Sequence, residues 1–106
     1  ITQKKGTVHQ MIQMSKHFQK ELDLAVKILR EAGCQEIFIF GSLATGEAKK
    51  NSEIDLAVRG CPPDMFFKTL GKLLRKLKHS VNLIDLDSRN PIAESIKEKG
   101  ELKRVA

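Results

Sequence analysis

Three short apolar runs constrain the fold of this chain more than any other feature. They occupy residues 36–40, 53–58 and 81–86, and turn-forming residues lie between them. Runs of this length and composition are typical of β-strands, and the uninterrupted IFIF is typical of a central strand buried on both faces. The sequence therefore predicts a small sheet of about three strands.

Helical patterns surround these strands. Ahead of the first strand, apolar residues recur at spacings of three and four, which indicates an amphipathic helix that ends near Gly33. A second helix should begin at Pro62-Pro63, and a third should run from Asn90-Pro91 to Gly100, since proline is tolerated at the first helical position. The stripe of the first helix consists of Met11, Met14, Phe18, Leu22, Ala25, Leu29 and Ala32.

The two later helices have apolar sides that should face the sheet. In the second helix this side consists of Phe66, Phe67, Leu70, Leu73, Leu74 and Leu77, and in the third of Ile92, Ala93 and Ile96. The opposite side of the second helix is basic, and its members are Lys68, Lys72, Arg75, Lys76 and Lys78. A solvated helix surface is the commoner explanation of such a basic stripe.

The lengths of the connections predict the topology. A helix separates the second and third strands, which favours a parallel crossover, whereas the short excursion between the first and second strands allows an antiparallel pair. The expected fold class is therefore α/β or α+β, a small mixed sheet flanked by helices. With 106 residues the chain should form one domain, 1–106, in which residues 1–7 are flexible.

Charge and composition limit the classes of ligand and partner that the chain is expected to bind. The net charge of +6 favours phosphate-bearing ligands such as nucleotides. The chain has no Trp or Tyr, and its five Phe are not interleaved with basic residues, so a base-stacking platform for nucleic acid is disfavoured. No apolar run approaches the length of a membrane span and no secretion signal is evident, so we expect a cytoplasmic protein without a membrane partner.

The cysteines and histidines of the sequence do not have the spacing of a disulfide framework or a metal site. Cys34 and Cys61 lack a metal-type spacing and are too few for a disulfide framework, which predicts free thiols in a reducing cytoplasm. His9, His17 and His79 are scattered, and no two of them share a ligand spacing, so no metal role is predicted for them.

Two acids stand in or beside the second strand. Glu53 and Asp55 are two residues apart, so on a strand both carboxylates project from one face. Taken alone, they fit the polar face of a half-exposed strand. Gly41-Ser42 at the end of the first strand changes this interpretation. Glycine lets the backbone approach a ligand closely, and a helical turn that follows would offer free N–H groups to a phosphate. Paired acids that hold a divalent cation beside phosphate are what nucleotidyl transfer requires.

A resemblance to a known family supports this interpretation. The segment FGSLATGEAKKNSEIDLAV, residues 40–58, resembles the signature of the DNA-polymerase-beta-like nucleotidyltransferase superfamily. The segment VNLIDLDSRNPIAESIKEKGEL, residues 81–102, looks like that of minimal nucleotidyltransferases of the MntA type, which are usually partnered with HEPN-domain proteins. The resemblance covers roughly residues 18–104.

The resemblance implies a set of site residues. Gly41 and Ser42 match the nucleotide-binding Gly-Ser that contacts the triphosphate of ATP. Glu53 and Asp55 match the catalytic acid pair that binds Mg²⁺ or Mn²⁺, and Asn82 occupies the position of the family's third metal-binding carboxylate. The implied partners are a nucleoside triphosphate and a HEPN-domain protein.

This chain departs from the family pattern at two of these positions. The first acid is normally Asp, and Glu53 is one methylene longer, which displaces its carboxylate from the octahedral geometry that Mg²⁺ requires. An amide at Asn82 cannot accept a proton from an acceptor hydroxyl. Asp85 and Asp87 are nearby in sequence, but their odd offset from Asn82 places them on the opposite face of a regular strand.

Two functions therefore remain open at the level of sequence. The first is an enzyme that transfers AMP from ATP to an acceptor such as a HEPN-type partner. The alternative is a catalytically impaired family member that acts as an antitoxin-like or regulatory partner-binding subunit. A nucleic-acid binder that uses the basic residues of 68–78 is the weakest interpretation, because no base-reading feature accompanies them.

Overall fold

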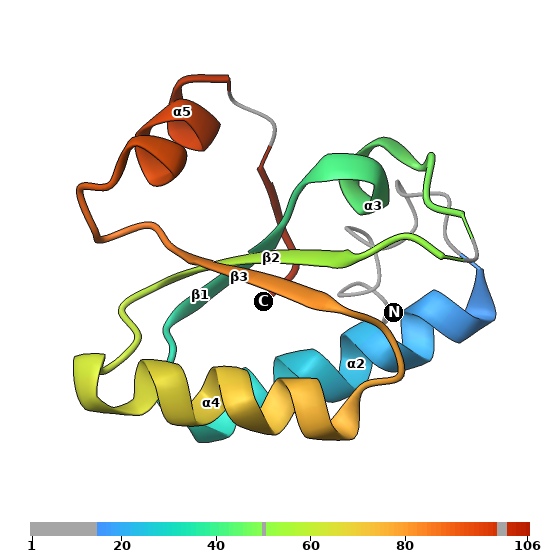
Figure 1. Cartoon of the computed structure of the whole chain (residues 1–106), viewed down its shortest axis with the longest axis horizontal. Helices are drawn as coiled ribbons and strands as arrows, with labels where there is room; N and C mark the ends of the chain where they lie inside the picture. The colour runs from blue at the N-terminus through green and yellow to red at the C-terminus, as the bar shows by residue number, and fades with distance from the viewer. Residues whose placement is uncertain (1–14, 50, 100–101) are drawn as a thin grey trace, which may run out of the picture.

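A four-stranded sheet with helices on both sides forms the structure, a computed structural model that describes residues 15–49, 51–99 and 102–106 (Figure 1). The strand order is β3-β2-β1-β4. This confirms the predicted class, a small mixed sheet flanked by helices. The elements are α2 (Lys16–Glu31), β1 (Glu36–Ile39), α3 (Gly41–Thr45), β2 (Ile54–Arg59), α4 (Pro63–Lys76), β3 (Val81–Asp85), α5 (Pro91–Lys99) and β4 (Lys103–Arg104).

Strand directions follow the connection lengths. β1 and β2 are antiparallel, with Ile39 opposite Leu56, and β2 and β3 are parallel, with Leu56 opposite Leu83. Helix α4 forms the crossover between the parallel pair, and both predicted directions are confirmed. The described helices include none that is long and apolar enough to cross a membrane.

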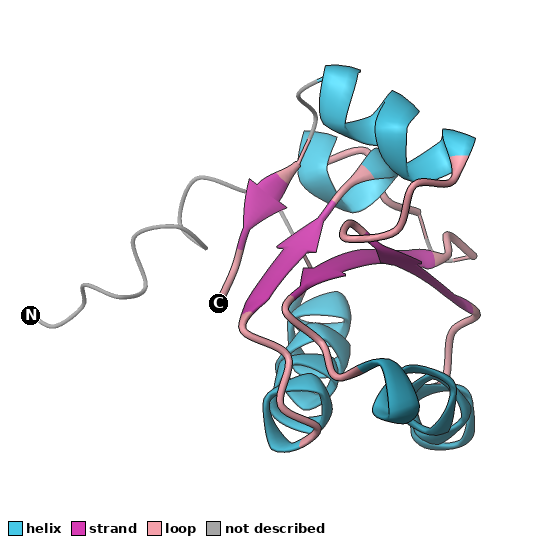
Figure 2. Cartoon of the chain, turned by 90° about the vertical axis from the view of Figure 1, so that its left-hand side faces the viewer, coloured by secondary structure: helices cyan, strands magenta, loops and turns pink. Residues whose placement is uncertain are grey.

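The core lies between one face of the sheet and helices α2 and α4, while α3 and α5 lie on the other side (Figure 2). Alternate residues of β1 and β2 point into this core, and those that are fully buried are Ile37, Ile39, Ile54, Leu56 and Val58. Burial of each such side chain stabilises the fold by about 1.5–3 kcal/mol.

Helix α2 buries the stripe predicted for it. Phe18, Leu22, Ala25 and Leu29 are buried, and Ala32 is half-buried just beyond the helix. The Ser15 side chain caps the start by accepting a hydrogen bond from the Phe18 backbone N–H. Three predictions lie outside the described residues: the start of the stripe at Met11 and Met14, the flexibility of residues 1–7, and the end of the last helix at Gly100.

The predicted inward faces of the two later helices are only partly correct. In α4, Leu73 and Leu77 are buried, but Phe67 is 78% exposed and Leu74 is 52% exposed. Phe67 and Leu74 are seven residues apart and therefore share a stripe to the side of the row that meets the sheet. In α5, Ala93 is fully buried, whereas Ile92 is 60% exposed.

The prediction that β1 is buried on both faces was wrong. Ile37 and Ile39 are buried, but Phe38 is only half-buried on the opposite face. The Arg59 guanidinium from β2 lies 5.8 Å from the centre of the Phe38 ring. A charged side chain rather than a helix therefore covers this aromatic ring.

Strand β4 was missed by the sequence analysis. It consists of two exposed basic residues, with Lys103 opposite Ile39 and Arg104 opposite Phe38. The Arg104 guanidinium also lies 3.1 Å from the Glu36 carboxylate on β1. Two polar residues carry no apolar alternation, so no sequence pattern could indicate this strand.

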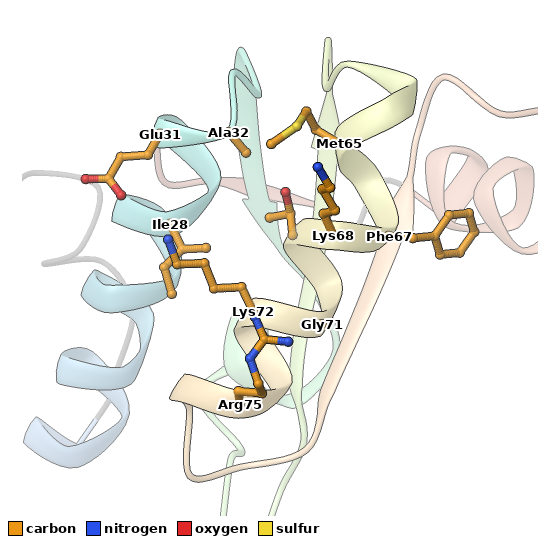
Figure 3. Close-up of a pocket in the computed structure, with 10 residues that line it drawn as sticks. Ile28, Glu31, Ala32, Met65, Phe67, Lys68, Gly71, Lys72 and Arg75 are labelled. Atoms are coloured by element: carbon orange, nitrogen blue, oxygen red, sulfur yellow. The ribbon is translucent and has the colours of Figure 1, made fainter.

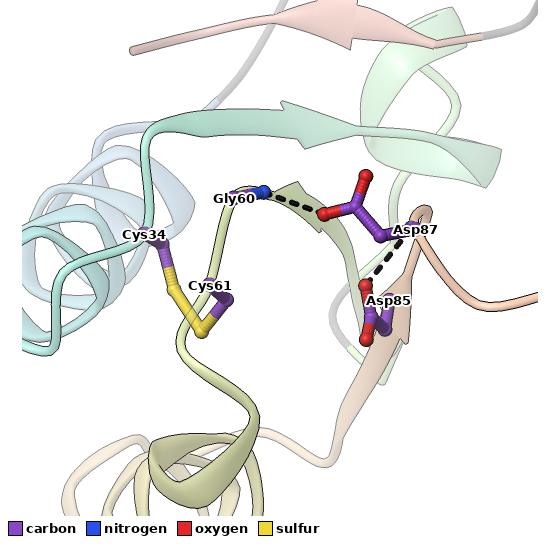
Figure 4. Close-up of a disulfide and its surroundings, with 5 residues drawn as sticks. All are labelled: Cys34, Gly60, Cys61, Asp85 and Asp87. Carbon is purple, nitrogen blue, oxygen red and sulfur yellow. Dashed lines mark hydrogen bonds between the residues drawn. A yellow bond between two sulfur atoms is a disulfide. The ribbon is translucent and has the colours of Figure 1, made fainter.

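The prediction of free thiols is also wrong, because Cys34 and Cys61 form a disulfide (Figure 4). The cause is the β1–β2 register. Glu36 lies opposite Arg59, and two further steps in each direction bring Cys34 and Cys61 together. The bond therefore joins the chain just before β1 to the chain just after β2.

We predict that reduction of this disulfide lowers the free energy of unfolding by about 3–4 kcal/mol, because the bond closes a 27-residue separation. Urea unfolding with and without reductant measures the difference. The Cys34→Ser/Cys61→Ser variant is the control and should not respond to reductant. Two free thiols in the unreduced, denatured protein would contradict the assignment.

Candidate functional site

Asp55 and Asn82 are neighbours across the parallel strand pair. The β2–β3 register places them directly opposite each other. Both point away from the core that α2 and α4 cover, since the adjacent Ile54 and Leu56 point into it. Glu53 is exposed and immediately precedes β2. The predicted acidic pair and the predicted third position therefore lie at one end of one face of the sheet.

The turn after β1 brings Gly41 against the same carboxylate. The backbone N–H of Phe40 donates to the Asp55 carbonyl at 3.1 Å, which continues the β1–β2 pairing by one residue. Gly41 follows with a φ of +65° and starts α3. A Cβ on Gly41 would overlap Oδ2 of Asp55 and lie 3.3 Å from its Cγ. Only glycine lets the backbone pass this close to the carboxylate.

Ser42 is the second residue of α3. Its carbonyl accepts from the backbone N–H of Glu47 at 2.9 Å and lies 3.3 Å from the Thr45 hydroxyl, so the short helix is closed by its own turn. Lys49, one of the two lysines in the following loop, is exposed. Lys50 lies outside the described residues.

The electrostatics of Asp55 are unfavourable to its charged form. Burial raises the pKa of Asp55 above its ordinary value, and the nearby negative charge of Glu53 raises this pKa further. A side-chain hydrogen bond with Asn82 acts in the opposite direction. The net effect is a carboxylate whose negative charge is incompletely compensated by the protein.

The chemistry of these side chains fits a magnesium or manganese ion. Asp55, Glu53 and Asn82 offer only oxygen ligands, which such ions prefer, and a cation would offset the repulsion between the two acids. Within the described part of the chain, no group of three or more His, Cys, Asp or Glu residues could hold a metal. A bound ion would therefore rely on two carboxylates, one amide, and oxygens from phosphate or water.

Asp85 and Asp87 do not join this site. Asp85 lies opposite Val58, three residues along the strand pair from Asp55. Asp87 accepts a hydrogen bond from the Gly60 N–H at 2.7 Å, and its own N–H donates to Asp85 at 2.9 Å (Figure 4). The two carboxylates stabilise the turn beside the disulfide, as expected from their odd offset from Asn82.

A separate groove opens to solvent between α2 and α4. Its volume is about 460 Å³, and it lies on the side of the sheet that these two helices cover (Figure 3). Lys68, Lys72 and Arg75 from the basic side of α4 line it, together with Ile28 of α2. Because Asp55 points from the opposite face of the sheet, this groove is separate from the acidic pair.

A small mixed sheet with a Gly-Ser turn after its first strand and an acidic pair at its second is the arrangement of a nucleotidyltransferase domain. The family model described as Polymerase beta, Nucleotidyltransferase matches residues 24–102, and the chain belongs to this family. Together with the solved structures below, this match makes it a minimal nucleotidyltransferase of the MntA type.

Several solved structures are similar to the chain. A toxin–antitoxin crystal structure with AMP-PNP has a TM-score of 0.64 and 27% identity, over 81% of this chain and 72% of that chain. An MntA–HepT toxin–antitoxin structure has a TM-score of 0.60 and 25% identity, over 83% and 71%. A tri-AMPylated Shewanella oneidensis HEPN toxin in complex with MNT antitoxin, at 24% identity, a TM-score of 0.60 and coverage of 83% and 71%, shows the fold alone. No curated protein matches the chain.

The raised pKa of Asp55 predicts that Asp55→Asn stabilises the metal-free protein at neutral pH. The wild type should lose stability as the pH rises from 3.8, the ordinary pKa of Asp, through the raised pKa of Asp55 in the folded protein. The Asn side chain of the variant does not titrate, so its stability should not show this loss. Thermal unfolding between pH 3.5 and 8, with a divalent-ion chelator, measures this. Glu53→Gln should increase the stability by less, because it removes only the repulsion by the Glu53 charge and leaves Asp55 buried. A destabilised Asp55→Asn at pH 7 would contradict this account.

The close approach of Gly41 predicts a second effect. Gly41→Ala should cost more stability than Gly46→Ala, for which left-handed strain alone is about 1–2 kcal/mol. Gly46 is the matched control because its φ is +80° and it caps the other end of α3. Only Gly41→Ala forces Asp55 or the backbone to move. Equal losses in denaturant unfolding would show that the contact with Asp55 is unimportant.

Proposed function

We propose that this chain is a metal-dependent nucleotidyltransferase that transfers AMP from ATP to an acceptor, a partner protein of the HEPN type. The observation that carries the proposal is the placement of Asp55 between Gly41, Glu53 and Asn82 in a chain of the nucleotidyltransferase family. The similarity to a toxin–antitoxin structure with AMP-PNP supports an adenine nucleotide as the substrate.

The site residues would have distinct roles. Asp55 and Glu53 would hold Mg²⁺ or Mn²⁺, and Asn82 would orient Asp55 and contribute an amide oxygen. Gly41 and Ser42 would bring backbone N–H groups to the triphosphate. Gly41 has no side chain, so the triphosphate can approach the backbone there. The metal, when bound, neutralises the charge that develops on the phosphate oxygens.

The transfer itself would be a substitution at the α-phosphorus of ATP. The acceptor hydroxyl oxygen forms the new bond to this phosphorus, the bond to the bridging oxygen breaks, and pyrophosphate leaves. The hydroxyl proton must go to a base other than Asn82, since an amide cannot accept it. Because Glu53 and Asp55 would hold the metal, solvent water would take this proton.

Asn82 also supports the second candidate, a catalytically impaired partner-binding subunit. It lies beside Asp55 in the strand register, at the position where the family pattern has its third carboxylate. In this candidate the chain binds a HEPN-type protein without modifying it. The similarity to MntA–HepT supports a partner of this type for both candidates.

The test is transfer of label from α-labelled ATP to a co-expressed HEPN-type partner. Asp55→Asn should reduce transfer by about 100-fold or more, because ligation of the charge-neutralising ion is worth several kcal/mol. Asp87→Asn is the matched control, since its amide oxygen can still accept from Gly60 N–H. Asn82→Asp should raise the transfer rate if the missing carboxylate limits the reaction.

The same preparation separates the two candidates. A stable complex with no detectable transfer by wild type, unchanged in Asp55→Asn, would reject the enzyme and support the partner-binding subunit. Transfer that is equal in wild type and Asp55→Asn would reject the assigned site.

A further inference from the structure

Two histidines that are 62 residues apart in sequence meet in space. Nε2 of His17 lies 2.6 Å from Nε2 of His79, although the sequence analysis assigned neither a role. His17 is in the first turn of α2, and His79 is in the connection between α4 and β3. The proposed transfer reaction uses neither side chain.

The hydrogen bonds fix the tautomer of His79. Its Nδ1 lies 3.2 Å from the backbone carbonyl of Ser52, and a carbonyl can only accept, so Nδ1 carries the hydrogen. Nε2 of neutral His79 then presents a lone pair to His17. The Phe18 ring packs against the His79 ring, with centroids 4.5 Å apart, and holds it in this orientation.

This is the arrangement by which proteins prepare an imidazole for a metal. A ligating histidine typically donates one ring N–H to a backbone carbonyl and coordinates through the other nitrogen. Here both Nε2 atoms converge on one point, where a cation could lie if the rings turned slightly apart. Zinc–nitrogen bonds of about 2.0–2.1 Å at a tetrahedral angle would place the two nitrogens roughly 3.3 Å apart. A small outward turn of the exposed His17 ring provides that separation.

The surroundings leave room for further ligands. A cavity of about 440 Å³ adjoins His17 of the pair, and it is lined by Ser15, His17, Phe18, Ala48 and Lys49. Lys49 is exposed, so its ammonium group can stay in solvent. The described residues supply no third His, Cys, Asp or Glu to this point, so water would complete the coordination.

We propose that His17 and His79 form a binding site for a divalent transition-metal ion of the zinc class, separate from the acidic pair. The site joins the start of α2 to the segment before β2, because His79 already contacts Ser52, the residue preceding Glu53. A bound ion therefore stabilises the segment that carries the acids. This inference does not depend on the proposed transfer activity.

The test is calorimetric titration of Zn²⁺ into the unreduced protein. Unreduced protein is required because free cysteines would also bind zinc. We expect one ion to bind through the pair, with affinity at least about tenfold lower in His17→Gln and in His79→Gln. Zinc could also bind the carboxylates of Asp55 and Glu53, so Asp55→Asn and Glu53→Gln are the controls. Both variants should keep the zinc binding that depends on the histidines.

A measurement on wild type avoids any folding defect in the variants. Nitrogen-15 NMR of the imidazoles should show that Zn²⁺ shifts Nε2 of both His17 and His79, while Nδ1 of His79 stays protonated. Absence of these shifts at saturating Zn²⁺, or zinc binding that Asp55→Asn abolishes, would overturn the proposal.

Discussion

The antiparallel register between β1 and β2 is the constraint on which the rest of the structure depends. At one end it places Phe40 beside Asp55, so that the next residue, Gly41, passes directly against the Asp55 carboxylate. At the other end the same register brings Cys34 to Cys61. A shift of one residue would reverse the faces of every side chain on β2 and bury the acids in the core.

The site works against the stability of the domain. Asp55 is half-buried and close to Glu53, and both conditions disfavour its charge. A bound cation would explain a carboxylate kept in such surroundings, because the compensation seen among the described residues is a side-chain hydrogen bond with Asn82. The left-handed backbone that requires glycine at position 41 and the repulsion between the acids occur at the same place.

Features with a local cause were predictable from the sequence. The strands, the helices and the strand directions follow from periodicity and connection length, and the acidic pair follows from a spacing of two residues. Features that depend on the assembled sheet were not predictable: the exposed two-residue strand β4, the exposure of Phe67, and the disulfide. The contact between His17 and His79 belongs to this second group, because α2 and the connection before β3 become neighbours only after folding.

The central claim is that the carboxylate of Asp55 forms a metal-dependent nucleotide site. Calorimetric titration of ATP into wild type and Asp55→Asn, with Mg²⁺ and separately with Mn²⁺, tests it without knowledge of the acceptor. The account predicts that wild type binds ATP only when a metal is present, and that Asp55→Asn loses this binding while remaining folded. No binding to wild type with either metal, or equal binding to both proteins, would contradict it.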